Sequence, residues 1–443
     1  MAIPLFQYQK TGAEWLAAGP RTLLLGDQMG LGKSATAISA CDLIGAQHIV
    51  VVGPAIMRTV WAREFARFAA LPRAVNVITD TKATLPKTGV TILSYEGASA
   101  PHLQKQLRDN GCDALILDEA HALKERDTLR TKSIYGTNCD GKDGIAQNAR
   151  RIWALTGTPA PNDASELYPI LRMSGLCAEG YWPFVRKFCT GYAGRFGFKI
   201  TGNNTANVPE LRALLSKLML RRKRDEVLTQ MPRLTISELS VAPTEVSNSQ
   251  YILEEMAHRS AKLAPAIDHA LETDDWSLAA LKHVATVRRL IGCAKVKAIA
   301  KYIDQELAAD PTSKIVVFGI HREALKYLCA YTAHHRPRIL WGGSSHEKRQ
   351  RHIDSFQSNH TRRVLLAQIK VAGAGITLTA ANRIIILEPS WTPSDNLQAI
   401  CRAYRIGQQR PVLAQFVSLA GSIDEAITST LIRKTQVISA LLD

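Results

Sequence analysis

The sequence predicts an α/β protein in which two lobes, each built on a parallel sheet, flank a helical middle. Three observations support this fold class. Short apolar, β-branched runs recur along the chain, as is typical of buried parallel strands. Helix-compatible stretches and polar or glycine-containing turns separate these runs. The series of runs stops from about Pro161 to Ala294, where the pattern is largely helical, and a second series then begins.

The expected strands fall into these two series. The first comprises Thr22 to Leu25, His48 to Val52, Val90 to Leu93, Ala114 to Leu117 and Arg151 to Leu155. The second comprises Lys314 to Phe318, Arg338 to Leu340, Val364 to Ala367, Arg383 to Leu387 and Val412 to Val417. Gly202 to Asn207 and Met231 to Thr244 are interpreted as loop or linker, and Asn138 to Gln147 as an exposed loop.

Size and composition exclude several classes of protein. The 443 residues suffice for two or three domains, and 46% hydrophobic with 21% charged residues is ordinary globular composition, so neither disorder nor a fibrous chain is indicated. Lys and Arg number 55 against 39 Asp and Glu, a net charge of +16. An excess of this size favours a polyanionic partner such as nucleic acid.

The cysteines and the hydropathy pattern indicate an intracellular protein. The eight cysteines are scattered, with no pair two residues apart and no nearby His in ligand spacing, so reduced thiols are expected and a zinc site is not. There is no signal sequence, and no run approaches the ~20 apolar residues that span a bilayer. We therefore expect a protein that is neither secreted nor bound to a membrane.

A glycine-rich turn follows the first expected strand and opens a helix. Its glycines let backbone amides approach phosphate, Lys33 reaches the outer phosphates, and the Ser34 hydroxyl can bind Mg²⁺. The turn predicts a site for ATP and Mg²⁺, although the usual first glycine is replaced by an acid. An ordinary strand-to-helix turn is the alternative. The expected ATP contacts here are Asp27, Gly30, Gly32, Lys33 and Ser34.

Two acids stand at the end of another apolar strand. Carboxylates at the carboxyl end of a parallel strand lie at the ligand edge of the sheet. Asp118 can hold Mg²⁺, while Glu119 can orient and deprotonate an attacking water. A solvated acidic turn is the alternative, and the phosphate loop upstream argues against it.

The order and content of these motifs resemble a superfamily-two helicase-like ATPase of the Swi/Snf type, a family of double-stranded DNA translocases. The resemblance covers nearly the whole chain and is most specific at "EPSWTPSDNLQAICRAYRIGQ" (Glu388 to Gln408), with "LMLRRKRDEVLTQMP" (Leu218 to Pro232) close to a second family signature. It implies two tandem RecA-like P-loop lobes with helical insertions, which close on one ATP.

The resemblance also assigns roles around the nucleotide. Gln9 would read the adenine, and His121, Thr156 and Thr158 would couple the ATP state to lobe movement. Phosphoryl transfer needs positive charge on the γ-phosphate, which an arginine from the second lobe can supply. Arg405 would be that arginine finger and Arg402 its neighbour, three residues apart on one face of a predicted helix, with Gln398 bridging nearby. A solvated basic helix face is the alternative.

The DNA contacts implied by the resemblance are contacts to the backbone, because a motor must step without regard to base sequence. For any one of these positions, core packing or a turn is the competing explanation. The basic cluster Lys348, Arg349 and Arg351 could line the same track. The implied contacts are Pro54, Ser94, Tyr95, His321, Arg322, Gly373, Gly375, Thr377 and Trp391.

The sequence also departs from the family pattern. Cys401 and Tyr404 replace an acid and a histidine of the family's arginine motif, while both arginines remain. The segment from Gln368 to Gly373 resembles the annealing-helicase branch more than the nucleosome-remodelling branch. Because the chain begins four residues before the first motif and ends soon after the last, a bare motor like the minimal bacterial and phage versions is expected.

The expected domain boundaries follow from the motif positions. They are 1–160 for the first RecA-like lobe, 161–230 for its helical protrusion, 231–245 for a linker, 246–295 for a second helical protrusion, 296–420 for the second RecA-like lobe and 421–443 for a C-terminal helical brace.

The leading hypothesis is a monomeric ATP-dependent translocase that remodels double-stranded or branched DNA, or removes other proteins bound to it. A strand-separating helicase on DNA or RNA is one alternative. An ATP-gated nucleic-acid-binding scaffold with weak turnover is another. A P-loop kinase would leave the arginine motif of the second lobe unexplained.

Overall fold

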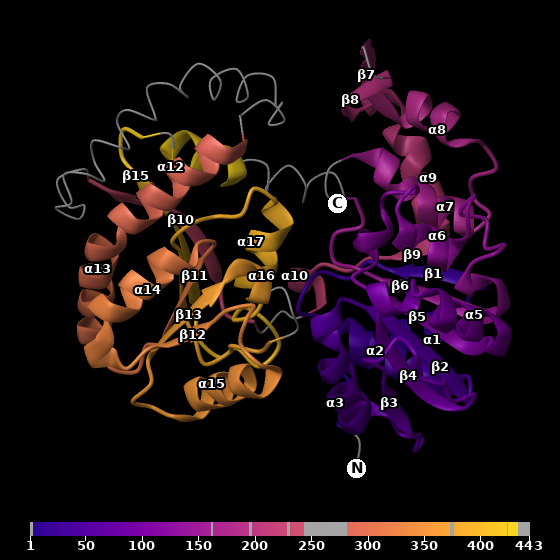
Figure 1. The fold of residues 1–443 in the computed structure, drawn as a ribbon, viewed down its shortest axis with the longest axis horizontal. Coiled ribbons are helices and arrows are strands. Elements are labelled where there is room, and N and C mark those ends of the chain that lie inside the picture. Colours follow the sequence, from indigo (N-terminus) through magenta and orange to yellow (C-terminus); the bar gives the residue numbers. More distant parts are fainter. Residues whose placement is uncertain are drawn as a thin grey trace. The chain divides into compact units, whose positions relative to one another are not determined.

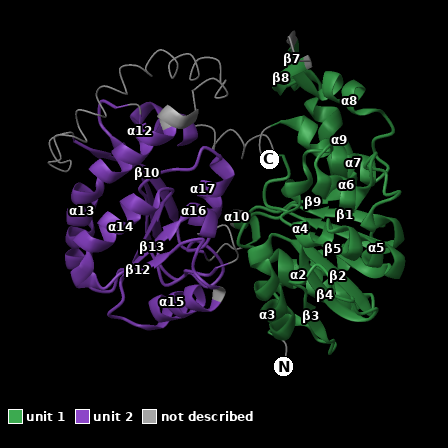
Figure 2. Ribbon diagram, viewed as in Figure 1, with its two compact units in different colours: residues 1–229 green, residues 230–443 purple. Residues whose placement is uncertain are grey.

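The computed structural model describes residues 3–160, 163–194, 197–227, 231–242, 281–372, 376–422 and 424–432. The chain divides into two compact units, Met1–Thr229 and Gln230–Asp443 (Figure 2). Each unit has a parallel sheet with its own core, which confirms the prediction of two α/β lobes. Among the described helices, none combines the length and apolar character needed to cross a membrane.

Unit 1 is built on a seven-stranded parallel sheet with the order β3-β4-β2-β5-β6-β1-β9 (Figure 1). Its strands are β1 (Thr22–Leu25), β2 (His48–Gly53), β3 (Val75–Val77), β4 (Gly89–Ser94), β5 (Cys112–Asp118), β6 (Ala149–Leu155) and β9 (Met219–Leu220). Its helices are α1 (Gln7–Ala18), α2 (Lys33–Leu43), α3 (Arg58–Phe68), α4 (Tyr95–Ala98), α5 (Pro101–Asn110), α6 (Leu129–Tyr135), α7 (Tyr168–Met173), α8 (Tyr181–Phe188), α9 (Val208–Leu218) and α10 (Arg224–Val227).

Both faces of this sheet are covered, which explains why its strands are continuous apolar runs. All six residues of β2 are buried. Successive side chains of a strand point to opposite faces, so Val50 and Val52 join one core cluster while Ile49 and Val51 join the other. Helices α1, α2 and α3 contribute to the second cluster, and α5 to α9 contribute to the first.

Unit 2 repeats this architecture with six parallel strands in the order β10-β15-β14-β11-β13-β12. Helices α12 to α14 share a core cluster with one face of the sheet, and α15 and α17 share one with the other. The strands are β10 (Leu234–Val241), β11 (Ile315–Gly319), β12 (Arg338–Leu340), β13 (Val364–Gln368), β14 (Arg383–Ile386) and β15 (Val412–Leu419). The helices are α12 (Leu281–Ala294), α13 (Val296–Ala309), α14 (Arg322–Tyr331), α15 (His346–Ser358), α16 (Ile369–Ala372) and α17 (Pro393–Ile400).

The expected linker at 231–245 is largely a strand, which corrects the sequence interpretation. Strand β10 pairs in parallel with β15 along its whole length, from Leu234 opposite Val412 to Val241 opposite Leu419. It forms the edge of the sheet, and within it only Val241 is buried. An edge strand needs few apolar residues, so the hydrophobic pattern was too weak to outweigh the prolines that flank the segment.

Two further segments differ from expectation. The stretch that was expected to be helical contains an antiparallel hairpin of β7 (Cys189–Gly194) and β8 (Gly197–Asn203), and β8 occupies the start of the expected loop at 202–207. The loop at 138–147 is only partly exposed, because Cys139, Ile145 and Ala146 are buried in the core of unit 1. The polar composition of this loop predicted exposure, but its few apolar residues are buried.

Candidate nucleotide and DNA site

The residues expected to bind ATP converge at one edge of the sheet of unit 1. The phosphate loop follows β1, Asp118 ends β5, and Thr156 follows β6 directly. Because all these strands are parallel, their carboxyl ends lie at the same edge. Pro54 and Ser94, which were expected to contact DNA, stand at the ends of the neighbouring strands β2 and β4.

The phosphate loop has the backbone geometry that glycine permits. Gly30 and Gly32 have φ values of 89° and 77°, and α2 begins directly after Gly32, so that Ser34 lies in its first turn. The first amides of a helix lack intrahelical acceptors and favour anions. The Lys33 ammonium group donates to the backbone oxygen of Asp27 at 2.9 Å, inside the loop. The loop therefore presents amides and a cation at the place where phosphates are expected.

A basic segment that is distant in sequence holds this loop in place. The guanidinium of Arg221 donates to the Gly26 oxygen at 3.0 Å, and Arg224 donates to the Met29 oxygen. Arg222 donates from its backbone N and its Nε to Asp27 Oδ1, at 3.1 and 2.9 Å, and its terminal nitrogen reaches Oδ2. These arginines belong to the Leu218 to Pro232 signature, for which the sequence indicated no partner.

The Asp27 carboxylate is engaged by Arg222 and fully buried. Its expected role as an ATP contact therefore stays a prediction, and the observed role of the side chain is to anchor the loop. The acid that replaces the usual first glycine supplies the partner for this arginine.

The acid pair at the end of β5 is built around a buried carboxylate. Asp118 accepts from Trp61 Nε1 at 2.8 Å and from the Glu119 amide at 3.0 Å. Burial, and after it the neighbouring charge of Glu119, raise the pKa of Asp118 to about 6. Nothing in the sequence indicated this contact between Trp61 and Asp118.

Glu119 links the acid pair to the expected coupling residues. It has a φ of 49°, a left-handed conformation that is uncommon for a residue other than glycine and that often marks functional sites. Its Oε2 lies 3.4 Å from His121 Nδ1, which is 3.1 Å from Thr156 Oγ1. Thr156 Oγ1 also accepts from the Thr158 amide at 3.1 Å. A polar chain therefore joins the ends of β5 and β6.

Gln9 packs against the phosphate loop from α1. Its Nε2 donates to the Leu31 oxygen at 3.1 Å, and its Oε1 accepts from the Phe6 amide at 3.0 Å. The Tyr8 hydroxyl donates to the same Leu31 oxygen at 2.9 Å. These contacts fix Gln9 beside the loop, while adenine reading stays a prediction.

In unit 2 the arginine motif lies beyond a helix instead of on one, which corrects the expected placement. Helix α17, which carries Gln398, ends at Ile400, and Arg402 and Arg405 lie in the turns that follow. Arg405 donates to Thr377 Oγ1 at 3.1 Å. Ala403 and Tyr404, which lie between the two arginines, are buried in the core of unit 2.

These turns are held by a glutamine to which the sequence assigned no role. Gln408 is buried, and its Nε2 donates to the backbone oxygens of Ala381, Thr379 and Ala403 at 2.8, 3.1 and 3.1 Å. Its Oε1 accepts from the amides of the next two residues, at 3.0 and 2.9 Å. A buried amide with all these partners fixes the backbone that carries Arg405.

Three residues of unit 2 that were expected to contact DNA, His321, Arg322 and Trp391, interact with other side chains of the same unit. Glu388 is buried and accepts from the His321 amide at 2.9 Å, while its other oxygen lies 2.6 Å from His321 Nδ1. Trp391 is 39% exposed, and the guanidinium of the buried Arg288 lies 4.3 Å from its ring centroid. Arg322 lies over the Trp341 ring at 5.8 Å. Trp391 is therefore partly exposed, with a buried cation against its ring.

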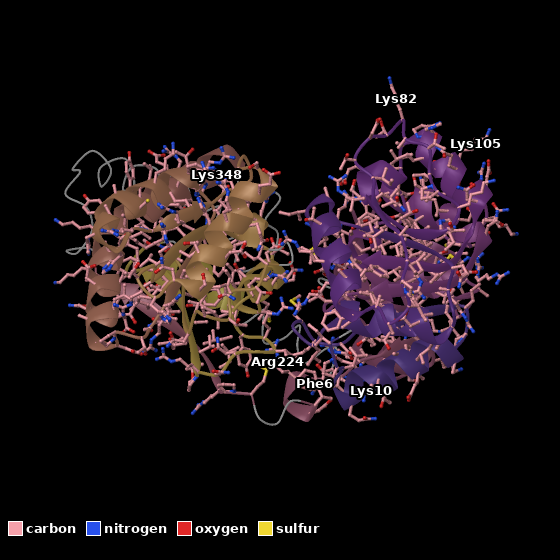
Figure 3. The ribbon with its side chains drawn as sticks, turned by 90° about the horizontal axis from the view of Figure 1, so that it is seen from below. Phe6, Lys10, Lys82, Lys105, Arg224 and Lys348 are labelled. Carbon is pink, nitrogen blue, oxygen red and sulfur yellow. The ribbon has the colours of Figure 1, made fainter. Side chains whose placement is uncertain are left out.

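The other residues that were expected to contact DNA differ in how exposed they are. The side chains of Ser94 and Tyr95 are buried, with the Ser94 hydroxyl capping α4 and the Tyr95 hydroxyl donating to the Asp118 oxygen, so only their backbone groups remain for DNA. Gly373 and Gly375 lie outside the described residues. Lys348 lies at the surface on α15, as Lys82 and Lys105 do on unit 1 (Figure 3).

Comparison with known proteins adds independent information. A family model described as "SNF2-related domain" matches residues 8–286, and one described as "Helicase conserved C-terminal domain" matches residues 294–407. The human protein "DNA annealing helicase and endonuclease ZRANB3" is 28% identical over 99% of this chain and 40% of its own length. A "SWI/SNF-related matrix-associated actin-dependent regulator of chromatin subfamily A-like protein 1" of Drosophila melanogaster is 27% identical over 99% of this chain and 56% of its own length.

The chain thus spans about half or less of the length of these relatives. Among solved structures, the "Sulfolobus solfataricus SWI2/SNF2 ATPase core in complex with dsDNA" is 22% identical, covers 100% of this chain and 93% of that chain, and has a TM-score of 0.46. The first family model alone covers more than half of the sequence. The protein belongs to the SNF2-related family of helicase-like ATPases.

Proposed function

We propose that the protein hydrolyses ATP to move along, and remodel, double-stranded or branched DNA. The observation that carries this proposal is that the phosphate loop lies at the same carboxyl edge of unit 1 as the polar chain that joins the acid pair to the coupling threonines. The family supports ATP as the nucleotide. The names of the relatives, which include a DNA annealing helicase, support DNA as the track.

The residues fit a magnesium nucleotide. The Ser34 hydroxyl and the Asp118 carboxylate are hard oxygen donors of the kind that Mg²⁺ prefers. Bound Mg²⁺ would neutralise charge on the phosphates. Lys33 then binds the outer phosphates, and Glu119 orients a water and accepts its proton.

In this proposal Arg405, with Arg402 beside it, supplies positive charge to the γ-phosphate from unit 2. Hydrolysis would then depend on the relative position of the units and would drive stepping along the DNA backbone. Trp391 and the backbone groups at Pro54 and Ser94 would contact the track. The domain limits 1–160, 161–230, 246–295, 296–420 and 421–443 belong to this proposal, as does a monomeric state; residues 246–280 lie outside the described part of the chain.

ATP turnover without nucleic acid and with duplex, forked and single-stranded DNA tests the proposal. We expect the strongest stimulation by duplex or forked DNA. Lys33→Ala should abolish turnover, and Glu119→Gln should retain ATP while turnover is lost. The absence of stimulation by every DNA would refute a DNA motor, and turnover that survives Glu119→Gln and Arg405→Ala would refute the assigned chemistry. Strand displacement from a forked duplex would favour the helicase alternative.

A further inference from the structure

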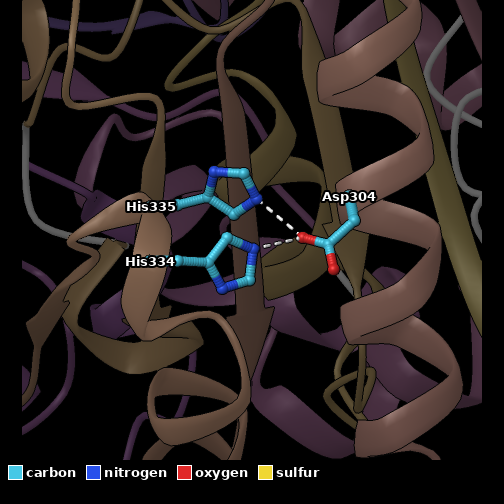
Figure 4. Close-up of side chains that lie close together, drawn as sticks. All are labelled: Asp304, His334 and His335. Carbon is cyan, nitrogen blue, oxygen red and sulfur yellow. Dashed lines mark hydrogen bonds and ion pairs between the residues drawn. The ribbon is translucent and has the colours of Figure 1, made fainter.

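Unit 2 carries a cluster of two histidines and an aspartate outside the site described above. Nε2 of His334 and Nε2 of His335 lie 2.8 and 2.6 Å from the same oxygen, Oδ1 of Asp304 (Figure 4). Asp304 belongs to α13, and both histidines belong to the short 3₁₀ helix η7 (Ala333–His335). Helix α14 leads from the carboxyl end of β11 back to η7 and β12, so the cluster lies toward the opposite edge of the sheet from His321 and Trp391.

The backbone presents both rings to the same carboxylate although they are adjacent in sequence. The His335 amide donates to the Thr332 oxygen at 2.9 Å, and Thr332 is itself buried, with its hydroxyl donating to the Leu328 oxygen at 2.7 Å. Arg336 ends the turn in a left-handed conformation, with a φ of 51°. The two ring centroids lie 4.1 Å apart. The histidines are therefore oriented by the turn as well as by the carboxylate.

Two imidazole nitrogens and one carboxylate oxygen form a donor set typical of Zn²⁺ and its neighbours in the transition series. The three ligand atoms lie within 4.8 Å of one another. In a tetrahedral zinc site such atoms are about 3.3 Å apart, so an ion would require the hydrogen-bonded atoms to separate by about 0.5 to 0.7 Å. Asp304 and His334 have side chains that are 46% and 57% exposed and can move this far.

We propose that Asp304, His334 and His335 bind a divalent transition-metal ion, Zn²⁺ in the first place, with water completing the coordination. Partial exposure provides an entry path and room for the water. Because the ligands come from α13 and from the turn after α14, a bound ion would connect these two helices and stabilise unit 2. No zinc site was expected from the sequence because its cysteines are not in ligand spacing. Asp304 lies 30 positions from His334, so the local spacing does not reveal this donor set.

Titration of the full chain with ZnCl₂ by isothermal calorimetry, without nucleotide, tests this site. We expect one Zn²⁺ per chain that is lost or weakened roughly tenfold or more in Asp304→Asn and in the double variant His334→Ala/His335→Ala. His360→Ala, at an exposed histidine on the same unit, is the matched control and should bind as the wild type does. Circular dichroism would verify that each variant is folded.

A second measurement separates a specific site from adventitious binding. Zn²⁺ should raise the melting temperature of the wild type and of His360→Ala, but not that of Asp304→Asn. Co²⁺ should give visible absorption bands that require the two histidines. Equal zinc affinity and equal thermal shift in wild type and Asp304→Asn would overturn the proposal and leave a hydrogen-bonded cluster only. ATP turnover enters neither measurement, so the result is independent of the proposed function.

Discussion

Breaking the ion pair between Asp27 and Arg222 should destabilise unit 1 and weaken ATP binding together. The Asp27 side chain is 0% exposed and that of Arg222 is 13% exposed, so the pair is almost entirely removed from water. Arg222 also donates to the Tyr8 oxygen on α1. The substitution Arg222→Ala would therefore leave a buried carboxylate without its cation and release the phosphate loop from one of its anchors.

The size of the effect follows from this burial. Removing one partner of a buried pair costs about 3–5 kcal/mol, because the remaining charge is uncompensated. Asp27→Asn keeps the shape and one acceptor oxygen, so we expect a smaller loss of roughly 1–3 kcal/mol. The double variant should lose less than the sum of the single losses, with a coupling energy of about 1–3 kcal/mol.

Hydrogen exchange at the amides of β1 and α2 would measure the opening free energy of unit 1 by itself. Calorimetry would give the affinity for ATP. Arg67→Ala is the matched control, because Arg67 pairs with Glu64 at 3.0 Å on the surface and is 55% exposed, so about 1 kcal/mol or less is expected. If Arg222→Ala changed stability no more than Arg67→Ala, or if the two losses simply added, the anchoring argument would be refuted.

Three further predictions concern single side chains. The raised pKa of Asp118, about 6 instead of 3.8, means that the folded state binds its proton more tightly than the unfolded state. The stabilising contribution of Asp118 is present below about pH 4 and is lost as the pH rises to about 6. Urea unfolding across this range should show a free energy of unfolding that falls with pH in the wild type but not in Asp118→Asn. The same dependence on pH in both proteins would contradict this prediction. Gln408→Leu should cost about 1–3 kcal/mol and lower ATP turnover, because three backbone oxygens lose their donor, and full turnover would argue against a positioning role. Trp391→Ala should keep basal turnover but reduce DNA stimulation, whereas Trp182→Ala, at a tryptophan that is 47% exposed on unit 1, should not; equal responses would remove Trp391 from the proposed track.

Local pattern carried much of the fold. Strands β1 and β12 begin and end at the predicted residues, and the other predicted strands differ by a few residues at their ends. Buried parallel strands are apolar on both faces, so each leaves a continuous run that needs no knowledge of its neighbours. Strand β10 was not predicted because an edge strand is partly exposed and therefore lacks a continuous apolar run. The prolines near its ends are also typical of linkers.

The motif residues could also be recognised from the sequence, because each motif depends on the spacing of residues within one turn or at the end of one strand. The sequence by itself thus determined two parallel α/β units, a phosphate loop and an acid pair at the ligand edge. Tertiary structure decided which partners these groups have. Asp27 meets Arg222 across 195 positions, and Asp304 meets two histidines from another element. Such pairings depend on which side chains come close together and are buried in the folded protein. In the low dielectric of a buried site a charged or polar group is stable only when it has a partner, and local sequence patterns do not show which residue that partner is.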